Sequence, residues 1–232
     1  MISPTHRDVD SREPKKIRLV HKAHSSTQAD IWLVSWNGQD CVLRDYSSPR
    51  AWCFRLLCRW AVRREVRVHR LLAGVEGIPR LVAVLDTDHY LIEFIEGKPL
   101  STWRKESPGM EIIRRLGEIV DRMHERGVAH GDIRNKNVLI TPDGMPYLVD
   151  FSTAWWGTSW WRKPLFRFYR LVDRQRLART KVKFEPSTLS EEERQLVDNP
   201  PFYLRLGRFY RHGIYQAMKR KRGQAEEEEE WQ

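Results

Sequence analysis

The spacing of hydrophobic and polar positions changes along the chain, and it predicts a sheet first and helices later. Short runs rich in apolar and β-branched residues are typical of strands. The predicted strands are 17–20, 31–36, 41–46, 81–85 and 90–95. Asn37-Gly38 is a hairpin signal between the second and third of them. The segment 51–72 carries apolar residues at helical spacing among arginines, which predicts one bent helix or two consecutive helices, ended by Gly77-Ile78-Pro79.

The second half of the chain has mainly helical periodicity. Segment 110–126 is an amphipathic helix with Ile113, Leu116, Val120 and Met123 on one stripe, and Gly127 is typical of its end. A short strand at 138–140 and a turn at 142–144 follow. Further helices are expected at 165–177, 190–197 and 201–219. Ser190 is the expected cap of the second of these, with Glu193 reaching back to it.

The composition is that of a folded chain with a highly charged surface. The 232 residues suit one domain or one two-lobed domain. Mean hydropathy is −0.63, and no stretch approaches the ~18 consecutive apolar residues of a membrane span. The segment 1–16 is polar and lacks the apolar centre of a signal peptide. The odd set of three cysteines shows no metal-type spacing, so we expect reduced thiols and a cytoplasmic location.

The charge is unevenly distributed. The net charge of +10 arises despite the acidic run Glu226–Glu230, because basic residues concentrate at 50–70, 162–183 and 205–222. Such a surface suits nucleic acid, anionic lipid head groups or a phosphorylated substrate, and the alternative is a solvated basic face with no dedicated partner. The segment 223–232 is expected to be an acidic disordered tail.

Two motifs carry candidate chemistry. Residues 130–137 read His-Gly-Asp-Ile-Arg-Asn-Lys-Asn, and 148–152 read Leu-Val-Asp-Phe-Ser. Together they suit phosphoryl transfer: Asp132 would accept a hydroxyl proton, and Asn137 and Asp150 would hold Mg²⁺ on ATP. Arg134 is a candidate for offsetting charge on the transferred group. Taken alone, Asp132 would instead be a turn or helix-cap residue, and His130 is expected to hold the loop and the Asp150 strand by hydrogen bonds.

With these motifs the chain resembles the protein-kinase-like superfamily, and more narrowly the RIO-type atypical kinases and bacterial lipopolysaccharide-core sugar kinases. The resemblance covers about residues 17–180. His-Gly-Asp is the form found in RIO kinases and in aminoglycoside and choline phosphotransferases. The segment 25–32, Ser-Ser-Thr-Gln-Ala-Asp-Ile-Trp, is similar to the RIO phosphate-binding loop, which implies ATP contacts by Ser25, Ser26 and Thr27.

The family pattern also has a lysine on the third strand paired with a helix glutamate. Here Arg44 stands at that position, and Glu65 is the natural partner. Arg44 keeps the charge and can bind a carboxylate or phosphates, but it is bulkier than lysine and not equivalent to it. The alternative for Glu65 is a solvated carboxylate that offsets the surrounding arginines.

The resemblance implies an α+β fold: a compact two-lobed protein-kinase-like fold with a small antiparallel-sheet N-lobe and a helical C-lobe. The segment 90–97 resembles the linker between kinase lobes, where the backbone of Glu93 and Ile95 would read adenine. No Ala-Pro-Glu-like segment follows Asp150, so no long activation segment is expected. The implied boundaries are a flexible N-terminus at 1–15, an N-lobe at 16–96, a C-lobe at 97–222 and the tail.

The sequence thus predicts an ATP- and Mg-dependent kinase acting on a protein Ser/Thr or on a lipopolysaccharide-core sugar at the inner membrane face. Arg44 and the glycine-poor loop favour an alternative, a nucleotide-binding pseudokinase with a regulatory role. A small-molecule phosphotransferase of the aminoglycoside kind suits the short, basic second lobe less well. The tryptophans at 155, 156, 160 and 161 are either core residues or, with the basic residues of the C-lobe, a peripheral contact with an anionic membrane surface; binding of nucleic acid is a further alternative.

Overall fold

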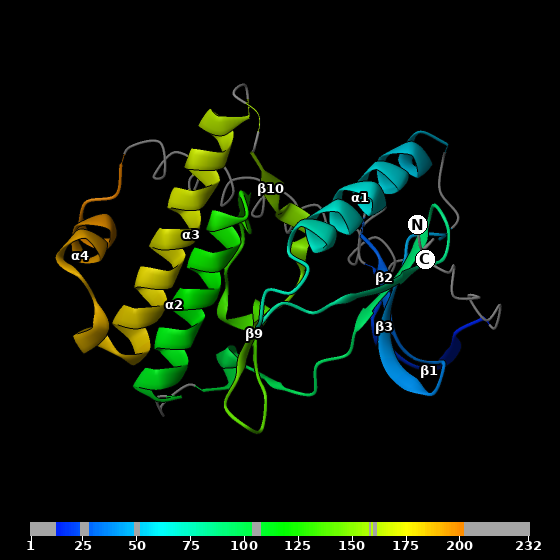
Figure 1. The fold of residues 1–232 in the computed structure, drawn as a ribbon, viewed down its shortest axis with the longest axis horizontal. Helices are drawn as coiled ribbons and strands as arrows, with labels where there is room; N and C mark the ends of the chain where they lie inside the picture. Colours follow the sequence, from blue (N-terminus) through cyan, green and yellow to red (C-terminus); the bar gives the residue numbers. More distant parts are fainter. Residues whose placement is uncertain are drawn as a thin grey trace, which may run out of the picture.

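The structure is a computed structural model, and it describes residues 13–23, 28–48, 52–103, 108–157, 159 and 162–201. The fold is α+β, with five strands in one antiparallel sheet in the order β1-β2-β3-β5-β4 (Figure 1). These strands are β1 (Lys15–His21), β2 (Asp30–Trp36), β3 (Gln39–Asp45), β4 (Leu81–Val84) and β5 (His89–Glu93). Asn37 and Gly38 have φ of 52° and 77°, which is the conformation of the predicted hairpin turn between β2 and β3.

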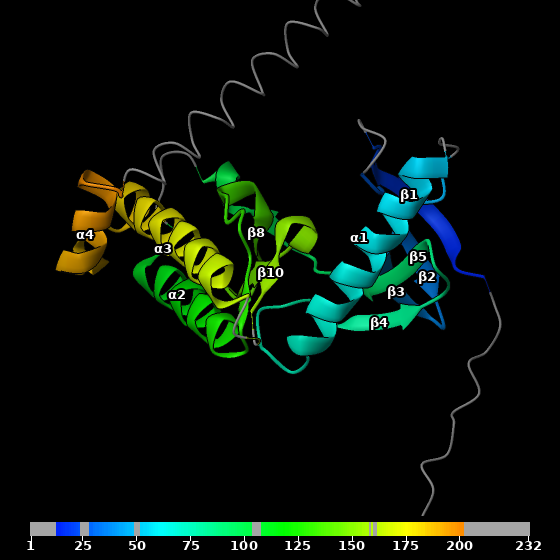
Figure 2. The same cartoon turned by 90° about the horizontal axis from the view of Figure 1, so that it is seen from above.

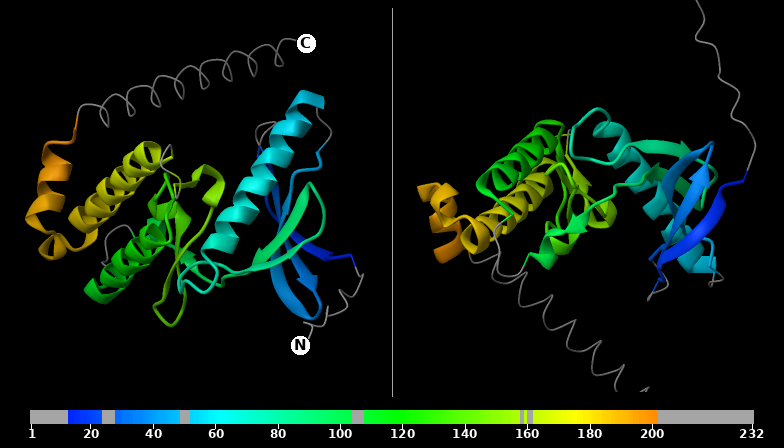
Figure 3. Two further views of the ribbon diagram at one scale, coloured as in Figure 1. Left: turned by 45° about the horizontal axis from the view of Figure 1, so that its top comes forward. Right: turned by 90° about the horizontal axis from the view of Figure 1, so that it is seen from below.

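A single helix, α1 (Trp52–Leu71), packs on this sheet. The predicted helical segment is therefore one helix. Its inner face buries Cys58, Val62 and Val66 against Tyr90 and Ile92 of β5. Figure 3 shows α1 lying across the sheet and apart from the other helices. This packing holds the carboxylate of Glu65, which is on the same helix, toward β3.

The remaining described helices form the other half of the molecule. They are α2 (Met110–Glu125), α3 (Lys163–Phe184) and α4 (Glu191–Asp198). Short strands accompany them: β6 (Lys98–Pro99), β7 (Val128–Ala129), β8 (Val138–Ile140), β9 (Pro146–Leu148) and β10 (Trp155–Trp156). Figure 2 shows α2 and α3 side by side, with the short strands between them and α1. The two-lobed, kinase-like arrangement that the sequence predicted is present.

The helix α3 is longer than the predicted segment 165–177. It continues to Phe184, where Glu185 and Pro186 follow. The residue before a proline is disfavoured in a helix, and proline has no N–H to donate, so the chain leaves the helix here. Lys181 and Lys183 lie in the last turn, where positive charge is favourable. The helix α4 begins with the predicted capping box between Ser190 and Glu193.

Some predictions lie outside the described residues: the helix at 201–219, the acidic tail and most of the flexible N-terminus. The lobe boundaries at 16–96 and 97–222 stay predictions. Within the described ranges, none of the helices combines the length and apolarity needed to cross a membrane.

Candidate active site

The loop after α2 is shaped by a glycine that a larger residue cannot replace. Helix α2 ends at Glu125, Gly127 adopts φ of 72°, and β7 leads into His130. Gly131 has φ of 77°, and a Cβ placed on it would lie 2.6 Å from the ring of Tyr169 and 3.1 Å from the carbonyl of Thr153. Such contacts are shorter than van der Waals distances, so the close approach of α3 requires glycine in His130-Gly131-Asp132.

Asp173 of α3 anchors this loop by hydrogen bonds to its backbone. Its fully buried carboxylate accepts hydrogen bonds from the backbone N–H groups of His130 (2.7 Å) and Gly131 (2.8 Å). It also lies 3.0 Å from Nε2 of His124 on α2. Three donors around one carboxylate fix the loop against both helices. The sequence analysis did not identify Asp173; its signal is that it is the only acidic residue of the arginine-rich helix α3.

Asp132 and Asn137 lie at opposite ends of one tight loop. Asn137 donates from Nδ2 to the backbone carbonyl of Asp132 at 3.0 Å and approaches the Asp132 carboxylate at 3.4 Å. Arg134 donates to the same oxygen, Oδ2 of Asp132. Because the amide nitrogen of Asn137 is engaged in this way, its carbonyl oxygen is directed elsewhere and remains a candidate ligand.

Asp150 has an unusual backbone conformation. Its φ of 68° and ψ of 71° are left-handed, which is rare for a residue with a side chain and occurs mainly where surrounding structure enforces it. The N–H of Val149 donates to the carbonyl of Asn137 at 2.9 Å, which ties this strand to the loop. The predicted hydrogen bond of His130 is present as well, between its Nε2 and the carbonyl of Val149 at 3.1 Å. These bonds bring Asp150 beside Asn137.

Arg44 joins the sheet to this loop region. Its Nη2 lies 3.0 Å from Oε2 of Glu65 and 3.3 Å from Oδ1 of Asp150. The predicted ion pair between Arg44 and Glu65 is therefore present, and Glu65 is buried rather than solvated. Burial by itself would raise the pKa of Asp150, but the charge of Arg44 and a hydrogen bond from Ser152 outweigh it and lower that pKa, so this carboxylate is ionised at neutral pH.

Two tyrosines complete the surroundings of Glu65. Tyr46 donates to its Oε1 at 2.6 Å, and Tyr90 donates to its Oε2. Burial and the neighbouring carboxylate raise the pKa of both phenols, so both remain protonated donors. The sequence analysis missed their role because both residues fit the apolar pattern of strands.

A cluster of buried rings in tilted and edge-to-face contact connects α1 with the loop. The ring of Phe151 lies 4.7 Å from that of His130 and 5.3 Å from that of His69 on α1. His69 has its Nδ1 3.1 Å from the carbonyl of Pro79, so Nδ1 carries the proton. Burial lowers the pKa of His69 to about 4, which keeps it neutral.

The other candidate residues are distributed differently. Ser25, Ser26 and Thr27 lie outside the described residues. Glu93 ends β5, where its N–H donates to the carbonyl of Arg80 at 2.9 Å and its side chain accepts from Arg80 N at 3.1 Å. Ile95 follows in the connection from β5 to β6.

The donor set fits Mg²⁺ held jointly with phosphates. Asp150 offers an ionised carboxylate and Asn137 a carbonyl oxygen, which are the hard ligands that this ion prefers. Among the described residues, no cluster of three or more His, Cys, Asp or Glu side chains is arranged to hold a metal ion by itself. Mg²⁺ commonly takes only one or two protein ligands and completes its shell with phosphates and water, so the sparse set suits it.

A basic hollow lies next to the loop. It has a volume of about 280 Å³. It is lined by Ile133, Arg134, Asn135, Arg176, Arg179 and Thr180. Thr180 donates to Oδ1 of Asn135 at 3.2 Å, which fixes α3 against the loop at this point. Three guanidinium groups and no carboxylate line the hollow, so its chemistry favours an anion.

The described tryptophans of the aromatic cluster are half-buried. Trp155 stacks on Trp156 at 6.2 Å and on Tyr169 at 6.2 Å, and Arg162 lies over both indoles. Trp156 also packs against the core that α2 and α3 share. These two residues are packing residues, and Trp160 and Trp161 lie outside the described part of the chain.

Comparison with known proteins agrees with this geometry. Residues 97–184 match the Lipopolysaccharide kinase (Kdo/WaaP) family. The chain is 29% identical over 100 residues to the KEOPS complex subunit Bud32 of Pyrococcus abyssi, covering 39% of this chain and 44% of that protein. It is 40% identical over 108 residues to the serine/threonine-protein kinase PknE of Mycobacterium tuberculosis, covering 41% of this chain and 18% of that protein.

A third relative is the probable serine/threonine-protein kinase YbdM of Bacillus subtilis, 36% identical over 73 residues, or 28% of each chain. The chain spans less than half the length of each of these relatives. The matched family segment contains the whole loop from His130 to Asn137 together with Asp150 and Asp173. These matches confirm the predicted resemblance to the protein-kinase-like superfamily.

Proposed function

We propose that this protein is an ATP- and Mg-dependent kinase that transfers the γ-phosphoryl group of ATP to a hydroxyl. The observation that carries the proposal is the convergence of Asp132, Asn137 and Asp150 beside the Arg44–Glu65 ion pair. Phosphoryl transfer needs charge neutralisation and alignment more than covalent chemistry, and this set supplies both.

Each residue has a distinct proposed role. Asp132 accepts the proton of the attacking hydroxyl, and Arg134 holds the Asp132 carboxylate and offsets charge nearby. Asn137 and Asp150 hold Mg²⁺, which neutralises the phosphates when bound. Arg44, positioned by Glu65, contacts the phosphates, with Ser25, Ser26 and Thr27 as further phosphate contacts. The backbone at Glu93 and Ile95 receives adenine.

The test separates binding from turnover. Asp150→Ala should abolish the thermal stabilisation that Mg-ATP gives, whereas Asp132→Asn should keep that stabilisation and lose phosphoryl transfer by about 10²-fold or more. Asp143→Asn, at an exposed turn, is the matched control and should behave as wild type. Transfer that survives Asp132→Asn unchanged would show that the assigned base is wrong.

We propose that the acceptor is an anionic sugar of the lipopolysaccharide-core type rather than a protein serine or threonine. The arginine-lined hollow beside Asp132 supports this choice, because a phosphate or carboxylate near the reacting hydroxyl would be bound there. The match to the lipopolysaccharide kinase family over 97–184 supports it too.

The acceptor class can be identified with labelled ATP and a lysate separated into membrane and soluble fractions. Label in a glycolipid of the membrane fraction is expected, and label confined to soluble protein would contradict the proposal. Arg176→Gln with Arg179→Gln should raise KM for the glycolipid about tenfold and leave KM for ATP unchanged. Arg167→Gln with Arg170→Gln, on the same helix but outside the hollow, is the control.

A second candidate function is that of a nucleotide-binding pseudokinase. It is favoured by one observation: Arg44 contacts Asp150 directly and so competes for the oxygen that Mg²⁺ would need. Nucleotide-dependent stabilisation without phosphate release or autophosphorylation, unrepaired by Arg44→Lys, would favour this function over the kinase.

A further inference from the structure

The outer face of α1 combines exposed large apolar side chains with arginines. Large apolar side chains are exposed on its first half: Trp52 is 76% exposed, Leu56 58%, Leu57 52% and Trp60 55%. Trp52, Leu56 and Trp60 follow each other at four-residue spacing, so they form one stripe. Water contact at this many large apolar groups is unfavourable and indicates an interaction surface.

The second half of the same face is basic. Arg63, Arg67 and Arg70 are exposed and continue the line of the apolar stripe toward the end of the helix. The helix has one acidic residue, Glu65, which is buried and directed to Arg44. Arg64 lies over the indole of Trp60 at 5.1 Å, which brings a further positive charge to the border between the two halves.

From this division we propose that α1 is a docking surface for an anionic lipid bilayer. Trp and Leu side chains insert at the boundary between head groups and acyl chains, and arginines of the same face bind anionic head groups. A nucleic acid would match the arginines but leave Leu56 and Leu57 in water. A second copy of this chain would place arginines opposite arginines if the two helices paired in parallel, and arginines opposite the apolar half if they paired antiparallel. The bilayer is the partner that satisfies both halves.

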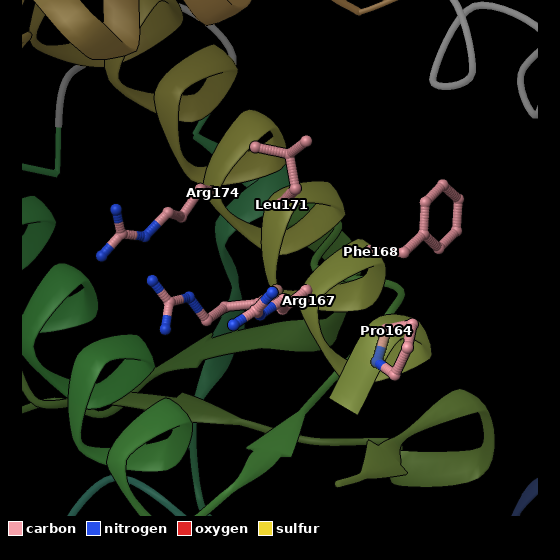
Figure 4. Close-up of a pocket in the computed structure, with 6 residues that line it drawn as sticks. Pro164, Arg167, Phe168, Leu171 and Arg174 are labelled. Atoms are coloured by element: carbon pink, nitrogen blue, oxygen red, sulfur yellow. The ribbon is translucent and has the colours of Figure 1, made fainter. Parts of the chain in front are cut away.

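The surface is distinct from the one expected from the tryptophan-rich segment. Trp155 and Trp156 are occupied by stacking with Tyr169 and Arg162. On α3 the exposed large apolar side chains are Leu165 and Val182. Figure 4 shows Arg167 and Arg174 extending to one side of that helix and Phe168 to the other. Arg167 and Arg170 therefore provide a charge control with the same residue type.

The experiment is flotation of the full-length protein with vesicles of phosphatidylcholine alone or with phosphatidylglycerol added. Wild type should float with the anionic vesicles and not with the neutral ones, and salt should weaken binding. Trp52→Gln with Leu56→Gln and Trp60→Gln should reduce lipid affinity by about tenfold or more. The same change at Leu165 and Val182, exposed on α3, should have no effect.

A charge variant covers the case in which the triple substitution impairs folding. Arg63→Gln with Arg70→Gln should lower affinity for anionic vesicles about 25-fold, since each surface cation contributes about fivefold. Arg167→Gln with Arg170→Gln should not. Wild type that does not float, or α1 variants that float as wild type does, would overturn the proposal. Wild type that is dimeric, with a monomeric triple variant, would overturn it in favour of self-association. None of these outcomes depends on kinase activity.

Discussion

Substitution of Asp173 by Asn removes the carboxylate that anchors the loop 130–137 and keeps the side-chain volume. The wild-type carboxylate accepts two backbone N–H groups and faces Nε2 of His124, all within 3.0 Å. The amide of Asn turns an NH₂ group toward one of these donors. One charge-assisted hydrogen bond is lost, worth about 1.5–3 kcal/mol, and a buried donor is left unpaired, costing about 1–3 kcal/mol. The expected loss of unfolding free energy is therefore about 2.5–6 kcal/mol.

Urea unfolding followed by circular dichroism measures this change. In thermal unfolding the midpoint temperature should fall by about 10 °C. Asp121→Asn is the control, because Asp121 is exposed on α2 and its nearest cation, Arg174, is 3.9 Å away. That variant should lose no more than about 0.5 kcal/mol. An equal effect of the two substitutions would refute the reasoning that Asp173 fixes the loop.

Three further predictions concern the stability of variants at buried positions. The pKa of His69 is lowered to about 4, so His69 takes up its proton more readily in the unfolded chain than in the folded one. Its contribution to stability is full above about pH 6.5 and is lost as the pH falls toward about 4, by about 3 kcal/mol in total. His69→Phe should flatten that part of the pH–stability curve. Gly131→Ala should lose about 3 kcal/mol in urea unfolding, whereas Gly38→Ala, with the same φ of 77° but open space, should lose about 1 kcal/mol. Glu65→Gln leaves Arg44 buried without its main counter-charge, and a loss of about 3 kcal/mol in the free energy of unfolding is expected. A loss as small as that of an exposed ion pair would show that Asp150 alone suffices to balance the charge of Arg44.

The sequence was most informative where local chemistry decides the structure. Asn37-Gly38 determines its hairpin, Ser190 and Glu193 cap their helix, and the spacing of Asp132, Asn137 and Asp150 anticipated their proximity. These features depend on neighbours in the chain or on a motif with fixed spacing.

Features that depend on distant segments were not predictable in this way. Asp173 lies among arginines in the sequence, and its burial follows only from how α3 packs under the loop. Arg44 was expected to pair with Glu65, but its second contact with Asp150 requires the sheet and the helical half to meet. The exposure of Trp52 and Trp60 could likewise not be predicted, because an apolar helical pattern does not show which face of the helix packs against the sheet.

A single nitrogen of Arg44 lies between carboxylates from both halves of the molecule, Glu65 on α1 and Asp150 after β9. The ion pair with Asp150 therefore links the two halves across the proposed nucleotide site. In the proposed kinase, binding of Mg-ATP would replace this ion pair, because Asp150 would turn to Mg²⁺ and Arg44 to the phosphates, so the cost of breaking it belongs to nucleotide binding rather than to the chemical step. Salt that screens the partly exposed Asp150 would lower that cost.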